Sequence, residues 1–226
     1  MCGRFAYFGN GIFGYETLLL PDPPPIDDYN IPPSRNILTI RNSPETGNPS
    51  YAVLRWGLVP FWSKTPKTKY ILNNARAEGI EKKPSFREPL KHRRCIIPAS
   101  GFYEWRRKGA QKQPYFIRRT DQGYMAIAGV WDHWQGEDGQ EIDSCSIITT
   151  EANKLILDIH DRMPVILDKN DLASWLDIDT ELDRVLSMLK PCPDSWIETY
   201  PVSYRVNSVK NNGPACVSNA TKSISE

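Results

Sequence analysis

The sequence has no hydrophobic run long enough to cross a membrane. Its longest apolar stretches, such as residues 124–131, fall far below the ~20 residues that a spanning helix needs. The chain also opens without a basic segment followed by an apolar one, so we expect no signal peptide. These two absences exclude a helical membrane protein and favour a cytoplasmic location.

Paired cysteines and metal-ligand spacings are also missing. The five cysteines are odd in number and scattered, without a CxxC pair or a companion histidine, and the chain has only 3 histidines. This pattern argues for a reducing compartment and against structural zinc. The cysteines are Cys2, Cys95, Cys145, Cys192 and Cys216.

What the chain does contain is a globular composition. With 226 residues, of which 40% are hydrophobic, it can bury a sizeable core. Several short segments have the composition of β-strands, and turn residues at 108–110 and 121–123 predict hairpins between some of them. The eight predicted strands cover residues 4–8, 36–41, 51–56, 94–98, 101–107, 114–119, 124–132 and 144–149.

Helical patterns are fewer. One run combines an N-cap at Thr180 with an apolar stripe and ends before Pro191, which predicts a helix packed on the core. We therefore expect an α+β fold, a single domain over residues 1–226 with a mainly antiparallel, barrel-like β-sheet and peripheral helices. A flexible tail is expected over 217–226. The predicted helices cover 151–158, 171–176 and 180–189.

Charge is segregated along the chain, although the net charge is only +1. Residues 80–120 hold 12 lysines and arginines against 3 acidic residues, a balance of +9. Residues 121–200 hold 5 against 17, a balance of −12. Such segregation predicts one basic face suited to a polyanion such as nucleic acid. Exposed hairpins also collect basic residues, so a merely solvated surface is the alternative.

The cysteine at position 2 is notable for its place. Its small side chain permits removal of Met1, which would leave an α-amine and a thiol on adjacent carbons. Unperturbed, the amine titrates near pH ~7.7–8.0 and the thiol near ~8.5, so we expect both to be partly deprotonated at neutral pH. Such a pair can capture an aldehyde as a thiazolidine, or act as an N-terminal nucleophile. Otherwise Cys2 is simply a small residue tolerated there.

Glu104 stands in the aromatic sequence Gly-Phe-Tyr-Glu-Trp. Strand alternation places it on the face of Phe102 and leaves Tyr103 and Trp105 on the other. Because both faces are aromatic, desolvation should raise the pKa of Glu104 and make it a proton donor near neutral pH. A strand glutamate paired with Arg106 is the alternative.

Three more groups offer chemistry. His160 is flanked by acids and Arg162, so it can transfer protons while the arginine holds a phosphate; a turn-capping histidine is the alternative. Asn74 can orient a nucleophile or hold a sugar oxygen, or it can cap a helix. Phe61 and Trp62 form an aromatic pair that can stack on bases, although aromatic residues are more often part of the core.

Several ordered motifs give the chain a family resemblance over most of its length. The sequence resembles the SOS response-associated peptidase family. The motifs are MCGRF (1–5), YNIPP (29–33), RWGLVP (55–60), NARAE (74–78), KPSF (83–86), GFYEW (101–105), IHDRMP (159–164) and VN through NN (206–212).

The resemblance implies an active site of Cys2, Asn74, Glu104 and His160 that cross-links to abasic sites in single-stranded DNA. After self-removal of Met1, the Cys2 amine and thiol would capture the ring-opened sugar as a thiazolidine and shield the lesion during repair. Glu104 would open the sugar ring and shuttle protons, His160 would assist proton transfer and release, and Asn74 would position the amine. No cofactor is required.

The resemblance also implies a set of DNA contacts. Three arginines would clamp phosphates, and a proline with two aromatic residues would shape the bend beside the missing base. The chain departs from some relatives, which have two adjacent tryptophans in place of Phe61-Trp62. The expected contacts are Arg4, Pro33, Phe61, Trp62, Arg76, Thr149 and Arg162.

The expected partner is single-stranded DNA containing abasic sites, bound by a monomer that does not associate with membranes and that would join the nucleoid in a bacterial host. Two other functions stay open. One is an N-terminal-nucleophile peptidase or amidase acting on other substrates. The other is a non-covalent reader of modified or single-stranded DNA, suggested by the basic segment.

Overall fold

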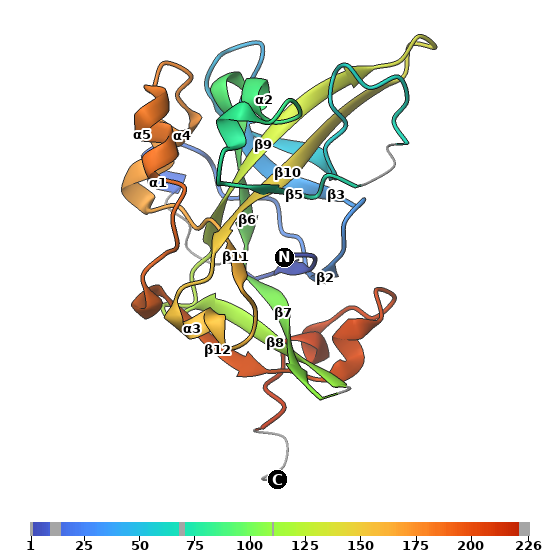
Figure 1. Cartoon of the computed structure of the whole chain (residues 1–226), viewed down its shortest axis with the longest axis vertical. Helices are drawn as coiled ribbons and strands as arrows, with labels where there is room; N and C mark the ends of the chain where they lie inside the picture. Colours follow the sequence, from blue (N-terminus) through green and yellow to red (C-terminus); the bar gives the residue numbers. More distant parts are fainter. Residues whose placement is uncertain (1, 10–14, 68–70, 110, 222–226) are drawn as a thin grey trace.

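Two β-sheets surround a common hydrophobic core in the computed structural model, which describes residues 2–9, 15–67, 71–109 and 111–221 (Figure 1). The main core cluster takes side chains from both sheets, including Phe102 and Ile117 from one and Ile96 and Ile127 from the other. Short helices lie outside the sheets. The expected α+β class is confirmed.

The larger sheet closes on itself. Five of its strands pair in the order β10, β4, β3, β6 and β9, and β9 pairs again with β10. The resulting ring confirms the barrel-like sheet, and closure leaves these strands without a free edge. The sheet contains β3 (Asn36–Asn42), β4 (Pro49–Trp56), β5 (Asn74–Arg76), β6 (Arg94–Ala99), β9 (Met125–Gln135), β10 (Glu141–Glu151) and β11 (Arg162–Pro164).

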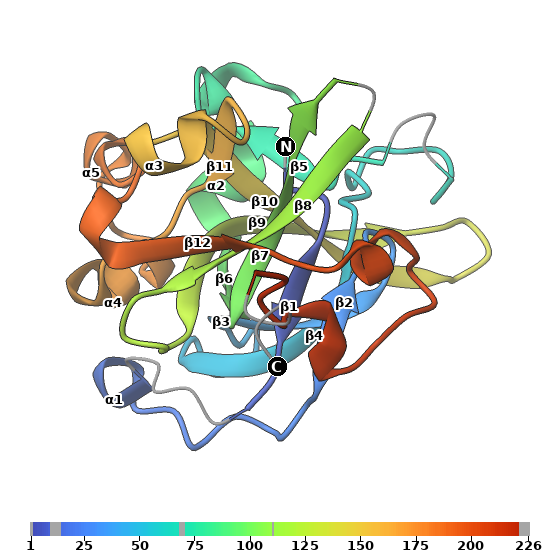
Figure 2. The same ribbon diagram turned by 90° about the horizontal axis from the view of Figure 1, so that it is seen from below.

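The second sheet is antiparallel and presents a different core on each face. Its strands follow the order β12, β8, β7, β1 and β2, seen side by side from below in Figure 2. Phe102 belongs to the main core, whereas Tyr103 belongs to a second cluster on the opposite face. The strands are β1 (Phe5–Tyr7), β2 (Asp28–Ile31), β7 (Gly101–Lys108), β8 (Gln111–Arg119) and β12 (Ile197–Pro201).

The helices are short and peripheral. In Figures 1 and 2, α1, α4 and α5 gather on one side of the molecule. None of the helices in the described part of the chain is both long and apolar enough to cross a membrane. They are α1 (Tyr15–Leu18), α2 (Arg87–His92), α3 (Lys154–Leu157), α4 (Leu172–Leu176) and α5 (Leu182–Ser187), with 3-10 turns η1 (Ile80–Lys82), η2 (Lys169–Asp171), η3 (Asp194–Trp196), η4 (Tyr204–Asn207) and η5 (Pro214–Cys216).

All eight predicted strands are present, but two helices begin at other residues than predicted. The helix predicted from residue 151 begins later, because Glu151 still pairs with Arg162 in the sheet and Asn153 provides the cap. Thr180 is not the cap of α5. Its hydroxyl donates to the carbonyl of Ser174 at 2.8 Å, and Glu181 takes the cap position.

The expected flexible tail does not start at residue 217. Val217 packs against the second core cluster, Asn219 forms a β-bridge with Val202, and the amide of Ala220 donates to the carbonyl of Pro201 at 2.9 Å. These contacts hold the segment against the end of β12. Residues 222–226 lie outside the described residues.

The basic residues of segment 80–120 are divided between separate parts of the fold. The basic segment folds into α2 and the β7–β8 hairpin, which lie far apart along the long axis in Figure 1. Some of its arginines form contacts within the protein. Arg94 is buried and donates to four backbone carbonyls, and Arg93 pairs with Asp132 at 3.0 Å. The charge is therefore divided between two ends of the molecule.

Candidate active site

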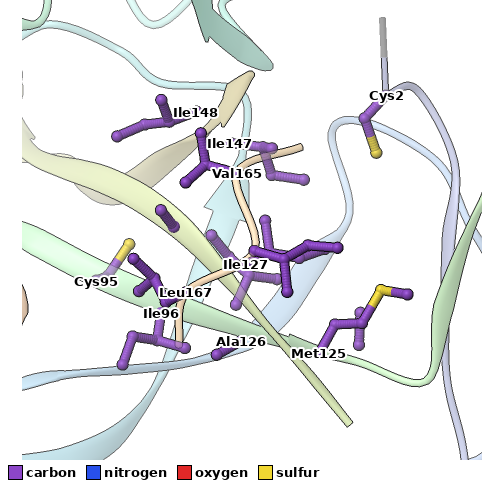
Figure 3. Close-up of a cluster of buried hydrophobic side chains, with 14 of the residues drawn as sticks. Cys2, Cys95, Ile96, Met125, Ala126, Ile127, Ile147, Ile148, Val165 and Leu167 are labelled. Carbon is purple, nitrogen blue, oxygen red and sulfur yellow. The ribbon is translucent and has the colours of Figure 1, made fainter. Parts of the chain in front are cut away.

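Cys2 is fully buried although it is only the second residue. Its exposed fraction is 0%, and Figure 3 shows it at the edge of the main core cluster, with its sulfur directed toward the apolar side chains. The segment is fixed by sheet pairing, because the amide of Tyr103 donates to the carbonyl of Arg4 at 2.9 Å. That bond aligns the start of β1 with the middle of β7, where Glu104 follows.

Asn74 holds Cys2 from the opposite sheet. Its Nδ2 donates to the backbone carbonyl of Cys2 at 2.7 Å. Asn74 is placed by β5, which runs parallel to β10 with Asn74 paired to Ile147. Its Oδ1 is buried and has no hydrogen-bond partner among the described residues. The side chain therefore uses its donor on the protein and has an acceptor left for another group.

Glu104 is a buried acid beside Cys2. It is 3% exposed, and desolvation raises its pKa to about 7. This confirms the prediction made from the two aromatic faces of its strand. A carboxyl group with a pKa near neutral can both donate and accept a proton at physiological pH.

His160 faces Glu104 from the turn after α3. Its Nε2 lies 4.0 Å from Oε2 of Glu104. Its Nδ1 lies 2.9 Å from both the backbone amide of Arg162 and Oδ1 of Asp161. The nitrogen can accept from the amide only without a proton and donate to Asp161 only with one. Because burial lowers the pKa of His160, the neutral ring is favoured, with its proton on Nε2 toward Glu104.

The expectation of a partly ionised thiol at Cys2 is wrong for the folded protein. Burial, and after it the charge of Glu104, raise the thiol pKa to about 12. The thiol is therefore neutral at physiological pH, and its ionisation or proton transfer needs a nearby base. Glu104 is the group placed to act as that base.

Arg162 is held by the protein on both sides. Its two Nη atoms form a bidentate pair with the carboxylate of Glu78 at 2.6 and 2.9 Å, and Nη2 also donates to the carbonyl of Thr149 at 2.6 Å. Thr149 is buried in β10, where it is paired with Arg76 of β5. The geometry brings Arg162, Thr149 and Arg76 together, and the carboxylate of Glu78 occupies the guanidinium of Arg162.

The other two arginines differ from Arg162. Arg76 is exposed, and among the described residues no carboxylate pairs with its guanidinium. Arg4 is half-buried and donates from Nη1 to Oδ1 of Asn30 at 2.7 Å and to the carbonyl of Val206 at 2.9 Å. Its guanidinium also lies 5.9 Å from the ring centre of Trp105. The guanidinium of Arg76 is thus exposed to solvent, whereas that of Arg4 is engaged within the protein.

Phe61 and Trp62 protrude from a loop whose backbone is firmly anchored. Their exposed fractions are 55% and 56%. The amide of Phe61 donates to Oδ2 of buried Asp132 at 2.9 Å, and the amide of Val59 donates to the hydroxyl of Ser144 at 2.8 Å. The two large aromatic side chains are therefore presented to solvent on a rigid support, as a stacking surface requires.

Pro33 belongs to the turn that joins β2 to β3. The next residue, Ser34, has a φ of 72° and donates its amide to the carbonyl of Trp56 at 2.7 Å. Because Trp56 ends β4 and leads into the aromatic loop, the Pro33 turn is linked to the base of that loop.

Two supporting residues were missed by reasoning from the sequence. Glu78 belongs to the NARAE motif, where its two-residue spacing from Arg76 gave the available signal. Asp132 ends the predicted strand 124–132, and nothing in the local sequence distinguishes it from a solvated aspartate. In the described part of the chain, no group of three or more His, Cys, Asp or Glu side chains is arranged to hold a metal ion.

Comparison with known sequences identifies the family of this fold and site. The family model described as SOS response associated peptidase (SRAP) matches residues 1–209. "Abasic site processing protein YoqW" of Bacillus subtilis is 43% identical over 223 residues, covering 96% of this chain and 99% of that protein. "Abasic site processing protein HMCES" of Xenopus tropicalis is 34% identical over 219 residues, covering 84% of this chain and 65% of that protein.

Solved structures agree with the fold. A crystal structure of a protein from Bacteroides thetaiotaomicron superposes with a TM-score of 0.78 at 33% identity, covering 85% of each chain. Another, from Bordetella bronchiseptica, has a TM-score of 0.76 at 25% identity and covers 89% of this chain and 100% of that one.

Proposed function

Since the chain belongs to the SOS response-associated peptidase family, we propose that it processes abasic sites in single-stranded DNA by covalent capture at Cys2. Removal of Met1 by the protein itself would first expose the α-amine. The names of the relatives support abasic-site processing, and the buried cluster around Cys2 supports the covalent chemistry. All four catalytic side chains come from one chain, which is consistent with action as a monomer.

The chemistry takes two steps. The amine of Cys2 adds to the aldehyde of the ring-opened deoxyribose, and loss of one water gives an imine. The thiol sulfur then bonds to the imine carbon, while the thiol proton ends on the former imine nitrogen. The product is a five-membered thiazolidine, and no oxidant, reductant or cofactor is consumed.

Glu104 and His160 divide the proton transfers. With a pKa of about 7, Glu104 can protonate the ring oxygen and then the departing hydroxyl, and afterwards remove the thiol proton. The neutral ring of His160, whose Nε2 lies 4.0 Å from Oε2 of Glu104, would pass its Nε2 proton to that carboxylate or to the sugar while Nδ1 takes up another proton from solvent, because the ring cannot be left without a proton. The two groups would form a proton relay through a closer approach or one bridging water, because 4.0 Å exceeds hydrogen-bond distance.

Asn74 positions the nucleophile through the backbone. Its bond to the Cys2 carbonyl fixes the residue, and its unpartnered Oδ1 is available to accept a hydrogen bond from the amine or from a sugar hydroxyl. Orientation of this kind lowers the entropy cost of the first addition.

The strand itself would be held by phosphate contacts and bent by aromatic residues. Arg76 offers a free guanidinium, and Arg162 would exchange Glu78 for a phosphate beside Thr149. Phe61 and Trp62, with the Pro33 turn, would fill the space beside the missing base. Arg4 would act mainly by fixing the site.

One observation carries the proposal: Asn74, Glu104 and His160 come from three distant segments and converge on the buried Cys2. The test is a denaturing gel after incubation with an oligonucleotide containing an abasic site. Wild type should give a heat-stable shifted band, and Cys2→Ala should give none. Cys216→Ala, another buried cysteine, is the matched control and should keep the band.

An undiminished band with Cys2→Ala would reject the proposal. Turnover of peptides or amides added to the wild-type protein, without cross-linking, would instead favour an N-terminal-nucleophile hydrolase. The intact mass of the purified protein shows whether Met1 has been removed, which is the condition for a free α-amine on Cys2.

Arg76→Ala is expected to weaken binding to single-stranded DNA of every sequence alike. One phosphate contact is lost, so the slope of log affinity against log salt should become shallower by about 0.7. Titration of a labelled oligonucleotide at several salt concentrations measures both effects. Arg184→Ala, on α5, should change neither, and an unchanged slope for Arg76→Ala would remove Arg76 from the phosphate contacts.

A further inference from the structure

The β7–β8 hairpin carries cations that neither the proposed active site nor the internal ion pairs use. Arg106 and Arg107 are both exposed, and neither has a carboxylate within 4.0 Å among the described residues. Farther along β8, by contrast, Arg118 pairs with Glu198 at 2.6 Å. The positive charges of Arg106 and Arg107, at the end of the hairpin, are therefore not neutralised by neighbouring carboxylates.

Arg106 continues the face of the sheet that contains Glu104. The two residues stand two positions apart on β7, so they share a face and are separated by about 6.6 Å along the strand. On β8, Tyr115 is paired with Glu104 and Gln113 with Arg106. This face therefore leads from the active site directly to the hairpin end.

A groove of about 520 Å³ lies at that end, and it has one exposed aromatic wall. Tyr204, the first residue of η4, is 49% exposed there. Nε2 of Gln113 donates to the carbonyls of Pro114 and Val202, both at 2.9 Å, which fixes β8 to the segment before η4. The lining residues are Arg106, Arg107, Gln111, Gln113, Tyr115, Pro201 and Tyr204.

The groove and the active site belong to one rigid unit. Nε1 of Trp105 donates to Oδ1 of Asn207 at 2.8 Å, and Nη1 of Arg4 donates to the carbonyl of Val206 at 2.9 Å. Both acceptors lie in η4, the turn that begins with Tyr204 beside the hairpin (Figure 1). A ligand that spans both places meets fixed surfaces at each.

We propose that this groove is a second DNA-binding site, which holds the single strand on one side of the abasic nucleotide. Arg106 and Arg107 bind phosphates, since guanidinium groups match phosphate oxygens bidentately. Tyr204 stacks on a base, which requires no particular sequence. The inference rests on the proposed function, because a strand captured at Cys2 would reach the groove along the face that Glu104 shares with Arg106.

The test uses an abasic analogue that cannot ring-open, so that binding is measured without cross-linking. Labelled oligonucleotides are extended on the 5′ or the 3′ side of the analogue, and their affinities are compared. Wild type should gain affinity on extension of one side only. Arg106→Gln/Arg107→Gln should lose that gain, about 10-fold or more, and its salt slope on the long strand should fall by about 1.4.

Two further variants separate the contributions. Tyr204→Ala should lose part of the same gain without a change in salt slope, because stacking releases no counterions. Arg87→Gln/Arg184→Gln removes the same number of charges from α2 and α5 and should behave as wild type. Thermal unfolding verifies that all variants are folded.

Equal affinities of wild type and Arg106→Gln/Arg107→Gln for the extended strands would overturn the proposal that the groove binds DNA. So would an equal loss on short and extended strands, which indicates a diffuse basic surface. Cross-linking of a short reactive oligonucleotide is measured in parallel. If wild type forms no band there, the proposed function fails; if the band forms and only the length dependence is missing, the groove alone fails.

Discussion

Glu104→Gln is expected to slow formation of the DNA cross-link by roughly 10²–10⁴-fold, the usual contribution of a general acid–base group. Glutamine keeps the shape of the side chain but cannot transfer protons. Affinity for an unreactive abasic analogue should change little, because Glu104 is buried and contributes no phosphate contact. Single-turnover cross-linking, followed by denaturing gel, measures the rate.

The dependence of the cross-linking rate on pH distinguishes proton transfer by Glu104 from a purely structural role of this residue. Wild type should show a change in rate near pH 7, where the carboxyl group titrates, and Glu104→Gln should lose it. A variant with the wild-type rate and profile would remove Glu104 from the proton relay.

The same substitution should stabilise the protein at alkaline pH. The pKa of Glu104 rises from 4.5 to about 7 on folding, so between these values the native state binds more protons than the unfolded state and stability falls as pH rises. The deficit is complete above about pH 7, is absent below 4.5, and is on the order of 3 kcal/mol. Denaturant unfolding at pH 8 and pH 4.5 should show an advantage for Glu104→Gln at pH 8 only.

Cys2→Ser is expected to abolish the heat-stable cross-link while leaving the imine step intact. Serine keeps the α-amine but has no sulfur, so it cannot form the stable thiazolidine ring. The imine can revert by hydrolysis, so the shifted band should appear only after reduction with borohydride. The variant should be made with a cleavable leader whose removal leaves the substituted serine as the first residue, so that self-removal of Met1 is not required.

A heat-stable band at wild-type yield from Cys2→Ser without reductant would contradict the thiazolidine. A missing band even with borohydride, in a folded variant of correct mass, would contradict capture by the amine. Cys145→Ser is a suitable control, because Cys145 is also buried but belongs to β10. It should give the heat-stable band without reductant.

The strands could be predicted where apolar residues gather over several positions, as in β7 and β9. Four shorter strands, β2, β5, β11 and β12, could not. β5 has three residues and no pattern of its own, and it forms because Ile147 to Thr149 of β10 provide hydrogen-bond partners for Asn74 to Arg76. A tertiary pairing of this kind leaves no local signal.

The candidate catalytic residues followed from the motifs, but the pKa values of their side chains depend on packing. The raised pKa of Glu104 could be predicted because its strand neighbours are aromatic. The neutral thiol of Cys2 could not, because the burial that raises its pKa comes from residues of both sheets. Likewise, the pairing of Arg162 with Glu78 joins segments far apart in the sequence.

The complete burial of Cys2 bears on the chemical lifetime of the protein. A terminal aminothiol in open solvent would react with soluble aldehydes and oxidants, and a reagent that is used once cannot be regenerated by turnover. In this fold the sulfur is enclosed in the core and kept protonated, which suppresses oxidation because the thiolate is the reactive form. Under the proposed mechanism, the barrel would protect the thiol from side reactions until a damaged strand reaches it.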